Sequence, residues 1–201
     1  MPVDDKINIQ LNQEGQWSDI PAEYIGDYSD FEPLDLSAEE KGIFESMHSL
    51  AKGNQWEYGC AVVDGIVSAP FTDELPDRVS IPEHYMAGNK VSFYHAHTNS
   101  TLLSAQDCKL LVNENVEKVA VITNNNDVFA ISVGSGYRPD KDEFEEAVSE
   151  IRGQANISVM EMPGFFDWTP EQRTYMAIRE QAFLIARRFG WKLEGGGFDA
   201  F

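Results

Sequence analysis

Cysteine is scarce in this chain, which limits the ways in which the protein can be held together. Its 201 residues include only two cysteines, Cys60 and Cys108. A single pair cannot form the disulfide framework that is typical of small secreted domains. We therefore expect two buried, inert thiols in a reducing compartment, and the sequence predicts a cytoplasmic protein. Export by a route that reads no N-terminal signal stays open.

The sequence also shows no targeting segment and no long apolar run. The N-terminal residues MPVDDKINIQ contain no basic region followed by an apolar stretch, so no signal peptide is expected. No apolar run reaches the roughly 18 residues that a membrane-spanning helix needs. Neither GxGxxG nor GxxxxGK[ST] occurs, so nucleotide binding has no support in the sequence.

Basic residues are few, since 15 Lys and Arg stand against 34 Asp and Glu, and the formal net charge is -19. Such a surface repels nucleic acids and anionic membranes, so neither is expected as a partner. Residues 1–45 carry twelve Asp or Glu and two Lys, whereas residues 171–192 carry five Lys or Arg and two Glu. The two ends can attract each other within one molecule, or the acidic residues can form a solvated face.

The remaining composition, 42% hydrophobic and 11% aromatic, is that of a globular protein. Ser37 and Glu40 form the capping box of a helix that we expect to end at Gly53. Two predicted hairpins and a single strand follow: strands 56–63 and 66–71 around Asp64-Gly65, a strand over 90–96, and VEKVAVIT with DVFAISVG. Further helices are expected from Ser104, in KDEFEEAVSEIR and after Thr169. This order predicts an α/β fold with a mixed β-sheet packed between helices.

The two ends of the chain are predicted separately. Residues 1–34 read as an acidic, extended arm that lies on a surface and supplies no core element. The last helix, after Thr169, carries an apolar stripe that is expected to pack on the domain core, with a partner groove as the lesser alternative. Both the acidic arm and this helix are open to a protein partner. The Gly-rich tail EGGGFDAF is expected to be mobile, unless its two phenylalanines anchor it.

Two of the four histidines stand one residue apart at the end of an apolar run. Side chains alternate between the faces of a strand, so His95 and His97 point the same way. Burying two imidazoles on one face is costly without strong partners, and together they can bind one metal ion. Asp107 lies at the third position of the helix that Ser104 caps, where it completes a capping box and also faces the preceding strand. Two imidazoles and one carboxylate are a ligand set that suits zinc.

Glu57 and the cysteines complete the set of candidates. Glu57 begins an otherwise apolar strand, which fits either a general base beside the metal or an exposed strand end. A structural zinc site made of both cysteines and both histidines is an alternative, although Cys60 points to the other face from Glu57. His48 and His84 are expected to be structural or exposed.

These residues resemble the motif of the JAMM, or MPN-plus, metalloproteases: an upstream Glu, His-x-His, and Ser-x-x-Asp at a helix start. The resemblance implies a divergent prokaryotic or phage-type member with a curved, cytidine-deaminase-like sheet between helices. It implies that His95, His97 and Asp107 bind Zn²⁺ and that Glu57 moves a proton from the zinc-bound water to the leaving amine. Ser104 would stabilise the oxyanion, with Ser100 as a weaker candidate.

Two departures from the family pattern are visible, and both lie in the loop after the second histidine. Six residues separate His97 from Ser104, where the family usually has seven. Thr98 also stands where many members have proline. The pattern covers about residues 37–135.

The expected activity is therefore hydrolysis of a peptide or isopeptide bond in a protein or peptide substrate, ubiquitin-like conjugates included. The expected division is an acidic arm at 1–34, a JAMM-like metalloprotease domain at 35–160, and a C-terminal helix with a Gly-rich tail at 161–201. The stretch FTDELPDRVSIPEHYMAGNK reads as a substrate-binding insertion beside an exposed sheet edge. A non-catalytic MPN-type scaffold and an acidic binding, inhibitor or nucleic-acid-mimic protein are the alternatives.

Overall fold

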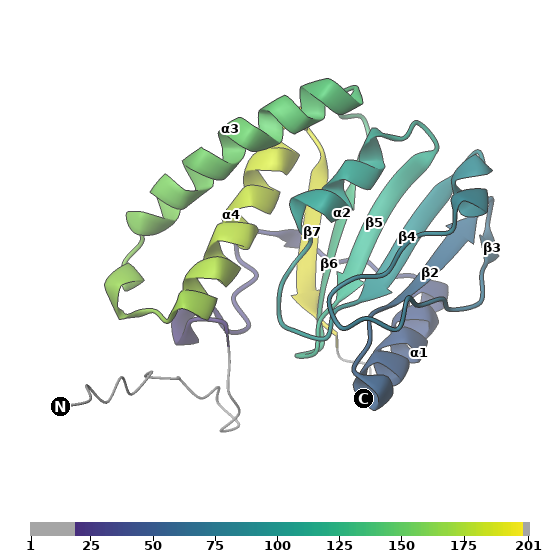
Figure 1. Cartoon of the computed structure of the whole chain (residues 1–201), viewed down its shortest axis with the longest axis horizontal. Helices are drawn as coiled ribbons and strands as arrows, with labels where there is room; N and C mark the ends of the chain where they lie inside the picture. Colours follow the sequence, from purple (N-terminus) through teal and green to yellow (C-terminus); the bar gives the residue numbers. More distant parts are fainter. Residues whose placement is uncertain (1–18, 199–201) are drawn as a thin grey trace.

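A computed structural model describes residues 19–198, which form a mixed seven-stranded sheet with four α-helices (Figure 1). The strand order is β1-β7-β6-β5-β4-β2-β3. The β1–β7 and β4–β5 pairs are parallel and the other pairs are antiparallel. The predicted α/β class with a mixed sheet is therefore confirmed. The strands are β1 (Glu32–Pro33), β2 (Tyr58–Val63), β3 (Ile66–Val67), β4 (Val91–Ala96), β5 (Val116–Ile122), β6 (Asp127–Ser132) and β7 (Lys192–Gly197).

Helices cover both faces of this sheet, because the strands alternate apolar side chains between two cores. Phe93 belongs to one buried cluster, which includes residues of α2, α3 and α4, whereas its neighbour Tyr94 belongs to the cluster that α1 forms on the other face. The strands read as continuous apolar runs, since both of their faces are buried. The helices are α1 (Ala38–Asn54), α2 (Ala105–Lys109), α3 (Lys141–Met160) and α4 (Pro170–Phe189).

The local signals for helix starts and for both hairpin turns are confirmed, but the strand predicted over 66–71 is wrong in length, since β3 covers only Ile66–Val67. Ser37 and Thr169 each cap a helix through a full capping box. Asp64 and Gly65 both have positive φ, which is the conformation of the tight hairpin turn that the dipeptide predicts. The expected end of the first helix at Gly53 is wrong by one residue. The helix continues to Asn54, and Gln55 leaves it in the left-handed conformation.

The tail prediction is wrong, because residues 192–197 form strand β7 between β6 and β1. Its three glycines allow close packing. A Cβ at Gly195 would lie 2.8 Å from Phe31 Cγ and 2.9 Å from Phe129 Cδ1. Phe198 follows β7 and is buried in the cluster that α1 forms, which agrees with the alternative that a phenylalanine anchors the tail. Phe201 lies outside the described residues.

The acidic arm at 1–34 is described from residue 19 onward, and this part packs on the domain. Ile20 and Phe31 are buried in the core, so the expectation that the arm supplies no core residue is wrong for them. The opposite charges of the two ends do meet. Asp30 forms an ion pair with Arg179 at 3.0 Å, and Glu32 lies 3.8 Å from the ammonium group of Lys192.

The C-terminal helix α4 packs on the sheet through its apolar stripe. Tyr175, Ala182, Ile185 and Phe189 are buried in the core, as the helical spacing predicts. Within residues 19–198, no helix is long and apolar enough to cross a membrane.

Candidate metal centre

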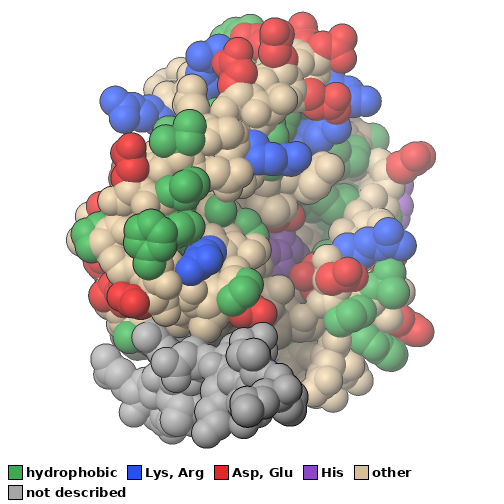
Figure 2. All heavy atoms as spheres, turned by 60° about the vertical axis from the view of Figure 1, so that its left-hand side comes forward, with side chains coloured by type: hydrophobic (Ala, Val, Ile, Leu, Met, Phe, Trp, Pro, Cys, Tyr) green, Lys and Arg blue, Asp and Glu red, His purple; other side chains and the backbone are tan. Residues whose placement is uncertain are grey.

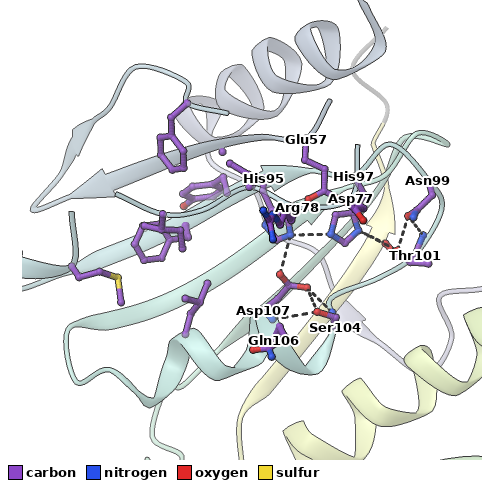
Figure 3. A pocket seen from close by; sticks show the side chains of 18 of the residues that line it. Glu57, Asp77, Arg78, His95, His97, Asn99, Thr101, Ser104, Gln106 and Asp107 are labelled. Carbon is purple, nitrogen blue, oxygen red and sulfur yellow. Dashed lines mark hydrogen bonds and ion pairs between the residues drawn. The ribbon is translucent and has the colours of Figure 1, made fainter. Parts of the chain in front are cut away.

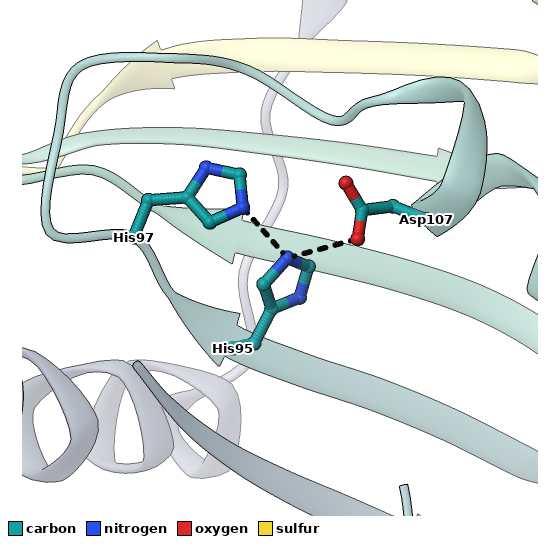
Figure 4. Close-up of side chains that lie close together, drawn as sticks. All are labelled: His95, His97 and Asp107. Atoms are coloured by element: carbon teal, nitrogen blue, oxygen red, sulfur yellow. Dashed lines mark hydrogen bonds and ion pairs between the residues drawn. The ribbon is translucent and has the colours of Figure 1, made fainter. Parts of the chain in front are cut away.

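The two histidines of the HxH pair lie side by side at the end of β4 (Figure 4). His95 is the fifth residue of the strand. His97 follows the strand and keeps its register, because its backbone N–H donates to the carbonyl of Ile122. Both side chains are buried, and their Nε2 atoms are 3.0 Å apart. The prediction that they share one face is confirmed.

Asp107 reaches the histidines from the first turn of α2, which follows the loop 98–103. Its Oδ1 lies 3.3 Å from His95 Nε2. One ligand atom from each of His95, His97 and Asp107 lies within 4.8 Å of the others. In residues 19–198 this is the only group of three or more His, Cys, Asp or Glu side chains arranged in this way. Such a cluster can hold a metal ion.

Ser104 fixes the direction of the Asp107 carboxylate. Its backbone N–H and its hydroxyl both donate to Asp107 Oδ2, at 2.6 and 2.7 Å. The backbone N–H of Asp107 donates in return to the Ser104 hydroxyl at 3.3 Å, which completes a capping box. One carboxylate oxygen is thus held by the helix start, and the other is left facing the histidines.

A carbonyl from the loop fixes the orientation of His97, which the sequence did not indicate. His97 Nδ1 lies 2.7 Å from the carbonyl oxygen of Thr101. Since a carbonyl only accepts, this contact places the proton on Nδ1 and leaves Nε2 with a lone pair that faces the cluster. Asn99 shapes the loop, because its Oδ1 accepts hydrogen bonds from the N–H and the hydroxyl of Thr101. The residue that could have revealed this turn in the sequence is Asn99, because Asn side chains often accept a hydrogen bond from the backbone two residues later.

The donor set fits zinc by its chemistry and its spacing. Zinc binds His nitrogen and carboxylate oxygen at about 2.0–2.2 Å in a tetrahedral arrangement, which places neighbouring ligand atoms roughly 3.3 Å apart. The separations of 3.0 and 3.3 Å around His95 Nε2 match that spacing. His97 and Asp107 also have outer hydrogen bonds, with Thr101 and Ser104, of the kind that metal-binding His and Asp side chains usually make.

Charge and burial oppose each other in this cluster. Burial raises the pKa of Asp107, but the neighbouring His95 outweighs it and holds the carboxyl pKa well below its usual range. Burial works to lower the pKa of His95, yet the Asp107 carboxylate raises it above the ordinary value. Burial and the adjacent His95 lower the pKa of His97 to about 4. The cluster therefore keeps a carboxylate and a neutral imidazole, both in the state that binds a metal.

Glu57 lies immediately before β2, and its side chain lines the same cavity (Figure 3). Glu57 is only 5% exposed. The alternative prediction, that it is simply an exposed residue at the start of a strand, is therefore wrong. Its backbone is held by Leu75 and by the hydroxyl of Thr72. Burial raises the pKa of the Glu57 carboxyl to about 7, against the lowering effect of His95 and with smaller raising effects from Asp107 and Asp77. A group with this pKa can take up and release a proton near neutral pH.

The cavity above the cluster has a volume of about 520 Å³. A histidine side chain is visible at the bottom of a hollow, with charged side chains along its sides (Figure 2). The segment expected to be an insertion, residues 71–90, supplies one wall, including Phe71, Arg78 and Met86.

The predicted exposed sheet edge beside this insertion is wrong at the site end of β2. Gly59 exchanges two backbone hydrogen bonds with Phe71, and the N–H of Glu57 donates to Leu75. The insertion therefore occupies the edge itself, and no substrate can add a strand there without displacing it.

The remaining candidates lie apart from the cluster. Ser100 donates to Asn124 and accepts from Asn125, and it does not line the cavity, whereas Ser104 does. Cys60 and Cys108 are free and belong to the buried clusters on opposite faces of the sheet. The alternative zinc site with both cysteines is therefore wrong. His48 is buried on α1, and His84 lies exposed in the insertion.

Comparison with known proteins yields no relative: no family model matches the chain, and neither a curated protein nor a solved structure matches it significantly.

Proposed function

We propose that this protein is a zinc-dependent hydrolase of amide bonds, a metallopeptidase or isopeptidase of the JAMM type. The observation that carries the proposal is the convergence of His95, His97 and Asp107 with a buried Glu57 in one cavity. A purely structural cluster would not need a cavity above it. The substrate class is a protein or peptide, with ubiquitin-like conjugates among the candidates.

Zinc is the metal that the ligand set favours. Imidazole nitrogen also suits copper, iron and nickel, but two His and one carboxylate with a free fourth position is a common catalytic zinc set. When bound there, zinc supplies a Lewis acid and lowers the pKa of a coordinated water to about 7.

Each polar side chain of the site has a role in this reaction. The buried Glu57 carboxyl accepts the proton of the attacking water and delivers it to the leaving nitrogen. Ser104 faces the cavity, and its hydroxyl can turn from Asp107 toward the oxygen of the scissile carbonyl. Only 5% of Glu57 is exposed, so its contact with bulk water is limited, which supports proton transfer at this residue.

The order of elements supports a divergent JAMM-type fold. A helix precedes the strand after Glu57, the HxH pair lies at the end of β4, and Ser-x-x-Asp forms the start of α2. The six-residue loop after His97 closes without disturbing the ligands, because Thr101 inside it contacts His97 directly. Its shorter length is compatible with the proposed site.

The first experiment is elemental analysis of the purified, untagged protein after zinc is supplied. We expect about one zinc per chain in the wild type. His95→Ala should lose this metal, because it removes the ligand that touches both others. His84→Ala is the matched control, since His84 is exposed and outside the cluster. Equal metal content in wild type and His95→Ala would overturn the assignment and leave the scaffold or acidic-binder alternative.

The second experiment separates metal binding from catalysis. Glu57→Gln keeps the size of the side chain but cannot carry the proton. We expect full zinc content with hydrolysis of peptide and isopeptide substrates reduced by at least about 100-fold. Full activity in Glu57→Gln would show that another group moves the proton.

A further inference from the structure

The cavity over the metal cluster has two chemically different ends. The labelled polar side chains gather at one end, around His95, His97 and Asp107 (Figure 3). The other lining residues include five that are large and apolar, and four of these are only partly buried: Phe71, Ile81, Met86, Phe93 and Leu110. An apolar wall that stays open to a cavity is the usual form of a binding pocket for an apolar group.

Gly59 brings this apolar wall directly against the cluster. Gly59 of β2 is the register partner of His95 in β4. A Cβ at Gly59 would lie 2.5 Å from Cε2 of Phe71, so the ring of Phe71 occupies the space of the missing side chain. The ring therefore lies against β2 beside His95, and Tyr85 stacks on it with ring centroids 5.6 Å apart.

Phe93 continues the same surface along β4. It precedes His95 by two residues and points to the same face, so it lies about 7 Å farther along the strand. Leu110, just after α2, and Met86 of the insertion line the cavity from other sides. The apolar end is thus adjacent to the cluster. Its distance from the cluster is about the spacing between neighbouring side chains of a bound peptide.

We propose that this apolar end is a specificity pocket for one large aliphatic or aromatic side chain, carried by the residue next to the amide that the cluster binds. The inference rests on the proposed function for its orientation, but the pocket itself is defined by the wall residues. Charge opposes an acidic occupant, because Glu57, Asp77, Glu83 and Asp107 line the cavity against one cation, Arg78. A substrate with an acidic side chain at this position is therefore disfavoured.

The test compares the binding of two nearly isosteric peptides, acetyl-Ala-Leu-Ala-amide and acetyl-Ala-Asn-Ala-amide. Binding to the full chain is followed by NMR titration, with zinc and after its removal by a chelator. Glu57→Gln protein is used where zinc is present, so that no peptide is cleaved. We expect the leucine peptide to bind roughly 10- to 100-fold more tightly, since burial of a leucine side chain stabilises a complex by that factor.

Two substitutions place the preference at the proposed wall. Phe71→Ala removes the ring beside His95, and Met86→Gln makes the wall polar with little change in volume. Either one should reduce the leucine preference by about 10-fold or more. Phe166→Ala is the matched control, because Phe166 is 85% exposed and does not line the cavity. It should keep the wild-type preference.

The outcomes separate this inference from the proposed function. A leucine preference that is lost in Met86→Gln or Phe71→Ala supports the pocket, even if no peptide is hydrolysed. Equal affinity of the two peptides for the wild type overturns it, even if the protein proves to be a peptidase. A preference that both wall variants retain also overturns it, since the side chain would then bind elsewhere.

Discussion

One backbone carbonyl, that of Thr101, decides which nitrogen of His97 faces His95. His97 Nδ1 lies against this carbonyl, and Asn99 holds the loop that presents it. Ser104 acts in the same way on Asp107, by binding one carboxylate oxygen and leaving the other free. At the scale of single residues, the candidate ligands His97 and Asp107 are therefore pre-oriented by neighbours outside the cluster.

Asn99→Ala should weaken zinc binding by about 10- to 100-fold, because the Thr101 carbonyl then loses its fixed position against His97. Competition with a chelating dye measures the affinity. The control is Asn125→Ala, since Asn125 donates to Ser100 and contacts no ligand. Unchanged affinity in Asn99→Ala would show that the loop keeps its shape without the asparagine.

At the scale of elements, the carboxylate of Glu40 links α1 to the sheet and also caps the start of this helix. Glu40 completes the capping box of the helix, and it also reaches across to two strands. Its Oε1 lies 2.6 Å from Nζ of Lys118 in β5 and accepts a hydrogen bond from the hydroxyl of Tyr94 in β4. Burial works to raise the pKa of Glu40, but the bonds from Lys118 and Ser37 outweigh it, and the pKa lies below 4.5.

This lowered pKa predicts a loss of stability in acid. A carboxyl whose pKa is lower in the folded state stabilises the protein above its unfolded pKa, and this contribution disappears as the pH falls through the folded value. Glu40→Gln preserves the capping box and removes the charge. At neutral pH we expect it to lower the free energy of unfolding by about 1–3 kcal/mol, because Lys118 is left partly buried beside a neutral group.

Urea denaturation at several pH values checks this expectation. The difference between wild type and Glu40→Gln should shrink as the pH falls below 4.5, the ordinary pKa of this group. Glu39→Gln is the control, as an exposed carboxylate in the same helical turn. A difference that does not depend on pH would mean that the hydrogen bonds, rather than the charge, matter.

At the scale of the whole molecule, the two described ends of the chain complete one side of the sheet together. β7 lies between β6 and β1, and Arg179 of α4 binds Asp30 while its guanidinium lies over the rings of Tyr24, Phe31 and Phe183. The cluster of His95, His97 and Asp107 lies toward the other side, at the end of β4. The ends therefore stabilise the sheet on which the cluster depends, without contributing a ligand.

Gly195→Ala should lower the free energy of unfolding by about 1–3 kcal/mol, because the new Cβ meets Phe31 and Phe129 at distances that force both rings to move. Thermal or urea denaturation measures the change. Gly197→Ala is the matched control in the same strand. Its Cβ would meet only the hydroxyl of Tyr28 at 3.5 Å and the ring at 3.9 Å, so it should be nearly neutral. Equal effects of the two substitutions would contradict the packing argument.

The sequence by itself determined the features that depend on neighbours along the chain. The helix starts at Ser37, Ser104 and Thr169, the turn at Asp64-Gly65 and the shared face of His95 and His97 follow from local hydrogen bonding and from strand alternation. Asp107 was also identified in this way, since its place in a capping box fixes it near the preceding strand. These inferences needed no knowledge of distant contacts.

Only the tertiary structure decided the features that depend on residues far apart. A glycine-rich tail reads as mobile because glycine has no side chain to pack, yet Phe31 and Phe129 fill the space that Gly195 leaves. Phe71 stands beside His95 for the same reason, at Gly59. The cavity and its apolar wall were likewise hidden, because they form only when the insertion folds back over β2 and β4. A glycine in the sequence does not show which distant side chain packs against it, so its structural role is visible only in the fold.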